Sequence, residues 1–216
     1  MLQLSISAAT DYVRKTLDEL TSVEEIGMLV SPDAVDIHKL VENSIIEAVV
    51  RIHNLAPSGM LEGVQGTAET DYTLGFIEND VISILMNKET LRMVSVSVAD
   101  SAFVVTEFIP EDSPEGRMQR NPYTRGVPDD PKVVIKKVSL ADRKPTLRYY
   151  TSSEKSHEAV SLTYIPYPDI ENDSVMISPS LEYAVLNELT AMVLDSVNEH
   201  EKAALYRGKA MSLIGQ

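Results

Sequence analysis

Residues 92–98 read RMVSVSV, and this stretch decides how the middle of the chain folds. The strict alternation predicts a β-strand that carries Val94, Val96 and Val98 on one face. Similar patterns predict further strands at residues 81–86, 103–109, 132–138, 146–151 and 159–166, with turns at 99–101 and 142–145. The connections are too short for crossover helices, so we expect residues 59–177 to form an antiparallel β-rich insertion.

Helical spacing of apolar residues precedes this insertion. Residues 5–20 predict a first helix, and residues 31–52 predict a second. Ser31-Pro32 fits the start of the second helix, because serine caps free N–H groups and proline is tolerated in the first turn. We therefore assign residues 1–58 to the N-terminal helices of a bundle.

A second pair of helices follows the insertion. Ser178-Pro179 repeats the serine–proline start and predicts a third helix. Asn198 followed by Glu201 fits a capping box at the start of a fourth helix. We expect residues 178–216 to form a helical hairpin that completes the bundle. The predicted fold class is α+β, a small helical bundle from the N- and C-terminal helix pairs with a large antiparallel β-rich insertion.

Residues 108–131 read FIPEDSPEGRMQRNPYTRGVPDDP and form the longest stretch without a helical or strand pattern. Compact domains seldom carry a structureless connection of this length unless it is a binding or assembly surface. We interpret it as an extended, proline-rich arm that contacts other proteins.

Charge is distributed unevenly along the chain. The formal net charge is −14, yet residues 117–155 hold 10 Lys/Arg against 4 Asp/Glu. Such an acidic chain is a poor candidate for a sequence-reading DNA-binding protein, which needs cations to neutralise phosphates. A basic band within an acidic body gives one copy faces complementary to another copy, although a solvated basic hairpin is an equal interpretation.

The sequence lacks a recognisable catalytic, cofactor-binding or metal-binding motif. It has no cysteine, and its four histidines are too few and too scattered for a histidine-based metal site. Asp169, Glu171 and Asp173 alternate as in a calcium loop, but Ser174 stands where the tight turn needs glycine. We expect an acidic surface turn here, no cofactor, and a protein that is not an enzyme.

The beginning of the chain does not have the basic-then-apolar layout of a signal peptide. No apolar run approaches the roughly 20 residues that a membrane-spanning helix needs. We therefore expect a soluble protein that is made in the cytoplasm and has no membrane partner.

Several short segments together resemble a known class of protein. They are LRMVSV (91–96), TEFI (106–109), EDSP (111–114), MQRN (118–121) and YTRG (123–126). They look like the middle of head-to-tail ring proteins of short-tailed bacteriophages, most of all connector rings of the crAss-like group and more distantly the tail tubular protein A family. The C-terminal helical hairpin is similar to the C-terminal helices of those adaptors. Proteins of that class often have a tryptophan near the turn that corresponds to residues 99–102, and this chain has none.

The resemblance implies a structural virion protein in the head-to-tail connector. It implies a ring of about twelve subunits that links the portal protein to the next tail or ring protein. DNA would pass through this ring without sequence-specific binding, since acidic side chains repel phosphates. On this interpretation Arg117, Arg120, Tyr123 and Arg125 of the arm contact a neighbouring subunit, and deletion of residues 113–128 leaves the monomer folded but blocks assembly. Lys202, Arg207 and Lys209 of the last helix contact an acidic partner. Solvated surface is the plain alternative for all six cations.

Two other function classes stay open at this point. The first is an assembly factor or regulator that binds a partner protein and is absent from the finished particle. The second is a hydrolase that uses an acidic cluster, for example on cell-wall glycans. It would need two carboxylates facing each other about 5–9 Å apart in a cleft.

Overall fold

The computed structural model describes residues 1–23, 36–78, 81–98, 103–127, 129–136, 143–150 and 160–216. By their contacts these residues form two compact units. We call residues 1–62 with 168–216 the helical unit, and residues 63–167 the β unit. The fold class is α+β, as the sequence predicts. Within the described ranges, no helix combines the length and the apolar character that a membrane crossing requires.

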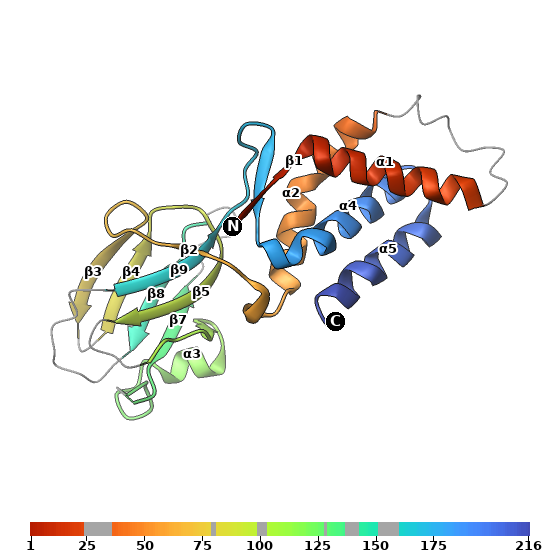
Figure 1. The fold of residues 1–216 in the computed structure, drawn as a ribbon. Helices are drawn as coiled ribbons and strands as arrows, with labels where there is room; N and C mark the ends of the chain where they lie inside the picture. Colours follow the sequence, from red (N-terminus) through yellow and green to blue (C-terminus); the bar gives the residue numbers. More distant parts are fainter. Residues whose placement is uncertain (24–35, 79–80, 99–102, 128, 137–142, 151–159) are drawn as a thin grey trace. The chain divides into compact units, whose positions relative to one another are not determined.

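The helical unit is built from helices of the two ends of the chain (Figure 1). Helix α4 packs against α1, α2 and α5 and is therefore buried on most sides, including every residue from Ala184 to Ala191. The elements are β1 (Leu2–Ser5), α1 (Ile6–Val23), α2 (Ile37–Leu55), η2 (Ser58–Met60), β10 (Ser174–Ile177), η3 (Pro179–Leu181), α4 (Glu182–Ser196) and α5 (His200–Leu213).

Strands β1 and β10 form a small antiparallel ribbon in this unit, with Leu2 opposite Ile177. The sequence analysis assigns residues 168–177 to the insertion, whereas their contacts place them in the helical unit. Strand β1 has no counterpart in the sequence analysis. Its pairing partner lies some 170 residues away, so local pattern does not reveal it.

The helix starts differ from the predicted ones. Ser31-Pro32 lies outside the described residues, and α2 begins at Ile37, where the Asp36 side chain accepts a hydrogen bond from the Lys39 backbone N–H at 3.2 Å. Ser178 caps no helix, because its hydroxyl is engaged with the Glu62 backbone, and a 3₁₀ turn follows before α4.

The predicted capping box at the start of α5 is wrong. Helix α5 begins at His200, one residue after Glu199, and has no side-chain cap. Asn198 lies instead in the left-handed region, with φ of 64°, and turns the chain between α4 and α5. The tight helical hairpin itself is present as predicted.

The β unit contains a three-stranded sheet in the order β2-β9-β5 and a five-stranded sheet in the order β3-β4-β8-β7-β6. Side chains from both sheets form one hydrophobic core, which includes Val96 and Leu162 of the first sheet and Ile84 and Tyr149 of the second. The elements are β2 (Val64–Gln65), β3 (Tyr72–Glu78), β4 (Val81–Met86), β5 (Thr90–Val98), β6 (Phe108–Pro110), α3 (Pro114–Met118), β7 (Lys132–Lys136), β8 (Thr146–Tyr150) and β9 (Val160–Pro166).

Strand β5 departs from the strict alternation of its sequence. The register shifts between Met93 and Ser95, which indicates an irregularity of the β-bulge type. As a result Met93, Val96 and Val98 are buried in the core, whereas Val94 is only half-buried. The expected strand at 103–109 is also shorter: its regular part is β6, preceded by a bridge between Val105 and Val96. The turn predicted at 99–101 lies outside the described residues.

The strand pairs are antiparallel with one exception among the described elements. Strands β6 and β7 run parallel, with Phe108 opposite Val133 and Pro110 opposite Ile135. Parallel neighbours require a crossover of a dozen or more residues, because the chain must return to the same end of the sheet. Residues 111–131 supply this crossover and contain α3. The stretch interpreted as an extended arm is therefore a folded connection within the β unit.

Candidate functional site

Hydrogen bonds among its own described residues fix much of the crossover (residues 111–131). Ser113 Oγ accepts a bond from the Gly116 N–H at 3.0 Å and caps α3. The buried Gln119 accepts the Gly126 N–H at 2.8 Å, and Thr124 donates to the Met118 carbonyl at 2.7 Å. A loop fixed in this way loses little conformational entropy when it binds a partner.

The crossover also displays apolar side chains to solvent. Tyr123 is 96% exposed, Met118 is 53% exposed and Val127 is 47% exposed. Single exposed apolar residues are common, but three on one short, internally bonded loop form a candidate contact surface. Tyr123 is the most exposed of the large hydrophobic side chains in the described part of the chain, and tyrosines are frequent anchors of protein interfaces.

Two of the three arginines predicted to serve the arm, Arg117 and Arg120, have partners inside the loop. Arg117 donates two bonds to the Asp112 carbonyl, at 2.9 and 3.3 Å. Arg120 pairs with the Glu111 carboxylate at 3.2 Å, and Arg125 is half-buried. Their role toward a neighbouring subunit stays a prediction.

Two of these arginines lie at a cavity of about 610 Å³, which we call the basic pocket. Glu111 in this pocket also accepts from Arg148 at 3.0 Å, so two arginines share one carboxylate. The pocket is lined by Pro110, Glu111, Asp112, Arg117, Arg120, Ile135 and Lys136. With Arg148 it brings four cations together with two carboxylates, which leaves an excess of positive charge.

The basic residues predicted on the last helix contact side chains of their own unit. Arg207 pairs with Asp195 at 2.7 Å and lies 3.5 Å from Glu188. Lys202 pairs with Glu199 at 3.5 Å. Lys209 places its ammonium 4.0 Å from the centroid of the Tyr206 ring, a cation–π contact. Their proposed contact with an acidic partner also stays a prediction.

A buried carboxylate lies at the centre of these charges. Glu188 is fully buried, and its Oε1 is 2.9 Å from Arg51 of α2. Its second oxygen has no hydrogen-bond partner in the described part of the chain. Hydrogen bonds from His200 and Arg207 lower the pKa of Asp195, and the bond to Asp195 raises the pKa of Arg207. The cluster therefore links α2, α4 and α5 electrostatically.

Sequence pattern alone does not predict this cluster. A local signal exists, since Glu188 is a charged residue within an otherwise uncharged run from Tyr183 to Leu194 on α4. Its partner Arg51 lies on another helix far away in sequence, so the pairing itself has no local signal.

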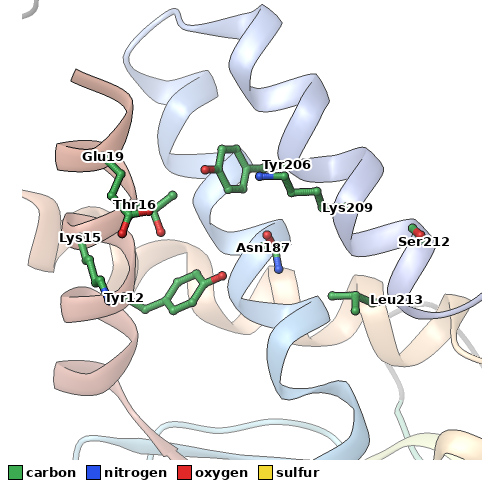
Figure 2. A pocket seen from close by; sticks show the side chains of 9 residues that line it. All are labelled: Tyr12, Lys15, Thr16, Glu19, Asn187, Tyr206, Lys209, Ser212 and Leu213. Carbon is green, nitrogen blue, oxygen red and sulfur yellow. The ribbon is translucent and has the colours of Figure 1, made fainter. Parts of the chain in front are cut away.

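A second cavity, of about 570 Å³, lies between α1 and α5 above α4 and is shown in Figure 2. We call it the helical groove. Tyr12 points across it toward Asn187, and burial raises the pKa of the Tyr12 phenol. The groove is lined by Tyr12, Lys15, Thr16, Glu19, Asn187, Tyr206, Lys209, Ser212 and Leu213.

Neither cavity holds the arrangement that glycoside hydrolysis needs. The helical groove has one carboxylate, Glu19, whereas the reaction uses two facing carboxyl groups. In the basic pocket the Glu111 carboxylate is engaged in ion pairs with Arg120 and Arg148. No group of three or more His, Asp or Glu side chains that could hold a metal ion occurs among the described residues.

Each of the three histidines that the structure describes has a hydrogen-bond partner. His53 is buried between two backbone groups, with Nδ1 2.9 Å from the Val49 carbonyl and Nε2 3.1 Å from the Ser178 N–H. This arrangement fits a neutral ring that donates from Nδ1 and accepts at Nε2. His38 contacts Thr10 and His200 contacts Asp195, while His157 lies outside the described residues.

Comparison with known proteins gives no match, either to a protein-family model or to a curated protein.

Proposed function

We propose that this chain is a structural virion protein that forms a ring in the head-to-tail connector of a short-tailed bacteriophage. The observation that supports this most is the crossover, which is fixed by its own hydrogen bonds and exposes Met118, Tyr123 and Val127. A prefolded loop with an exposed aromatic anchor suits a protein that assembles with others. The sequence resemblance to connector rings points to the same class.

The charge distribution supports contacts between unlike faces of neighbouring copies. The helical unit contains 18 Asp/Glu and 7 Lys/Arg. The β unit contains 15 Asp/Glu and 12 Lys/Arg, so it is much closer to neutral. Contacts between different faces of identical subunits generate closed rings when the rotation closes. The acidic balance also fits a passage for DNA, because repulsion of phosphates prevents nonspecific binding.

The proposal is tested by quantitative mass spectrometry of purified virions from the phage that encodes this chain. We expect the protein in the particle at about one copy per portal subunit, since stacked rings with matched symmetry have equal subunit numbers. A protein that binds the portal but is absent from the particle is an assembly factor, which would contradict the proposal.

The role of the crossover is tested separately by Tyr123→Ala, with Tyr183→Ala as the matched control. Tyr183 is a second exposed tyrosine, 62% exposed, on α4 of the helical unit. We expect Tyr123→Ala to reduce incorporation into particles by about tenfold or more, the scale of an interface anchor. Tyr183→Ala should not. Equal effects of the two substitutions would remove the crossover from the proposal.

A further inference from the structure

The basic pocket has positive charge that its own acids do not neutralise. Arg120 and Arg148 share the single carboxylate of Glu111. Arg117 is bound to a backbone carbonyl, which carries no formal charge, and the exposed Lys136 has no ion pair within the described residues. Guanidinium groups gathered at a cavity are suited to bind carboxylates.

The helical unit contains a segment with the opposite character, the acidic turn (residues 169–173). Asp169, Glu171 and Asp173 are all exposed, and none has a basic partner in the part of the chain that the structure describes. No other five-residue stretch in the described helical unit holds three carboxylates. By comparison, Asp195 and Glu199 are paired with cations of α5.

The acidic turn is held in a fixed shape. Asn172 and Asp173 adopt the left-handed conformation, with φ of 50° and 60°. Glu171 and Ser174 exchange two backbone hydrogen bonds, of 3.0 and 3.1 Å, and the Asp173 carbonyl accepts the Ile6 N–H at 2.9 Å. Backbone strain of this kind persists where surrounding bonds hold it, so the carboxylates are presented on a preorganised segment.

We propose that the basic pocket of one copy binds the acidic turn of a second copy, an inference that rests on the proposed ring and specifies its subunit contact. The two surfaces belong to different units of the chain, so the contact is head-to-tail and can repeat around a ring. A cavity of about 610 Å³ has the size of a small-ligand site and accommodates the tip of a turn. Nucleic-acid phosphate is a poorer occupant, because the whole chain carries −14.

The absence of cysteine makes a direct test available, since every disulfide then comes from introduced residues. One full-length variant carries Pro110→Cys in the pocket, and a second carries Ile170→Cys in the turn, so all charges are kept. The two are mixed and oxidised, and the disulfide-linked dimer is measured on a non-reducing gel. The matched control replaces Ile170→Cys by Asn43→Cys, an exposed and uncharged position on α2.

We expect about tenfold more linked dimer from the pocket–turn pair than from the control pair, since disulfides form only between closely approaching cysteines. Adding Arg117→Glu and Lys136→Glu to the pocket variant should abolish this excess, because like charges then face each other. Adding Asp169→Lys and Asp173→Lys to the turn variant should restore it. Rescue of this kind separates a charge contact from damage to the crossover.

Linkage equal to the control, or linkage that ignores the charge reversals, would overturn the proposed contact. So would retention of duplex DNA that Arg117→Glu and Lys136→Glu remove, since the pocket would then bind phosphate. The virion measurement keeps the two proposals apart. If the linkage depends on charge but the protein is absent from virions, the subunit contact is supported and the connector function is not. If the protein is in virions but does not show this linkage, the connector function is supported and this subunit contact is not.

Discussion

Glu188 is a carboxylate in an environment that charged side chains seldom occupy. It is fully buried, and its charge is balanced by Arg51 and Arg207, whose side chains are 43% and 31% exposed. Removing the compensation of a buried charge costs more than removing the charge itself, because the remaining ion stays desolvated. We therefore expect removal of the two arginines to lower the stability of the fold more than removal of the Glu188 charge.

We predict that Arg51→Met with Arg207→Met lowers the free energy of unfolding by about 3 kcal/mol or more. Glu188→Gln should lower it by only about 1–2 kcal/mol, because the neutral amide still accepts a hydrogen bond and leaves two partly hydrated arginines. Denaturant unfolding followed by circular dichroism measures both. Equal losses would mean that packing, rather than charge compensation, decides the stability of this cluster.

Asp195 gives the cluster a dependence on pH. Bonds from His200 and Arg207 hold its pKa below the usual value in the folded state. Its pairing therefore stabilises the fold fully above the unfolded pKa, near 3.9, and this stability is lost as the pH falls through the folded pKa.

We predict that Asp195→Asn is less stable than the parent protein at neutral pH, by roughly 0.5–1 kcal/mol because the side chain is partly solvated. The difference should shrink below about pH 4 and vanish at lower pH, as Asp195 itself becomes protonated. Thermal unfolding of both proteins from pH 7 to pH 3 gives the comparison. A difference that is constant over this range would contradict the assigned role of the carboxylate.

At the scale of elements, the crossover is the feature on which the β unit and the proposed contacts both depend. Residues 111–131 connect the parallel strands β6 and β7, so deleting residues 113–128 would leave too few residues for a crossover. We therefore expect this deletion to disrupt the fold of the β unit, contrary to the sequence-based expectation that the monomer stays folded. Point substitutions, rather than deletions, are the appropriate tests of this segment.

Gly116 is the point where the crossover packs most closely. A Cβ at this position would lie 2.2 Å from the Pro110 carbonyl oxygen, so Gly116→Ala forces the backbone apart. We predict a loss of about 1–3 kcal/mol, the usual cost of overpacking. The control is Gly208→Ala on α5, where nothing lies within 4 Å and the substitution should gain about 0.5–1 kcal/mol. Differential scanning calorimetry of the two variants measures whether each is less or more stable than the parent protein.

The elements also show which parts of the fold a sequence can predict. Helix α5 and strand β4 follow from local periodicity, because each buries regularly spaced side chains. Helix α4 and strands β7 and β8 follow from their apolar sequence, although each also buries adjacent residues. Strand β1 and the parallel pairing of β6 depend on partners distant in sequence, and the bulge in β5 depends on its register against β9. Such features are decided by tertiary contacts, which local pattern does not contain.

The same distinction applies to the candidate sites. Tyr123 and the loop arginines were predicted because an irregular stretch with five prolines is conspicuous in the sequence. Glu188 with Arg51, and the joining of Lys136 to Arg117 in one pocket, needed the folded chain. Helix starts were also predicted too simply, since Ser178 bonds to Glu62 rather than to a helix N-terminus.

At the scale of the whole molecule, the chain consists of two units with separate cores. The β unit is one continuous segment, residues 63–167, whereas the helical unit is assembled from both ends of the chain. We predict that residues 63–167 expressed alone unfold in a single cooperative transition, because their core is internal. A fragment that shows no cooperative transition by circular dichroism would mean that the β unit needs the helical unit to fold.

The central claim, that this chain assembles as a connector ring, is tested most directly by mass photometry of the protein alone and mixed with the portal protein from the same genome. The account predicts a complex with the mass of the portal plus about a dozen copies of this chain, as matched closed rings require. A chain that stays monomeric and adds no mass to the portal would contradict it.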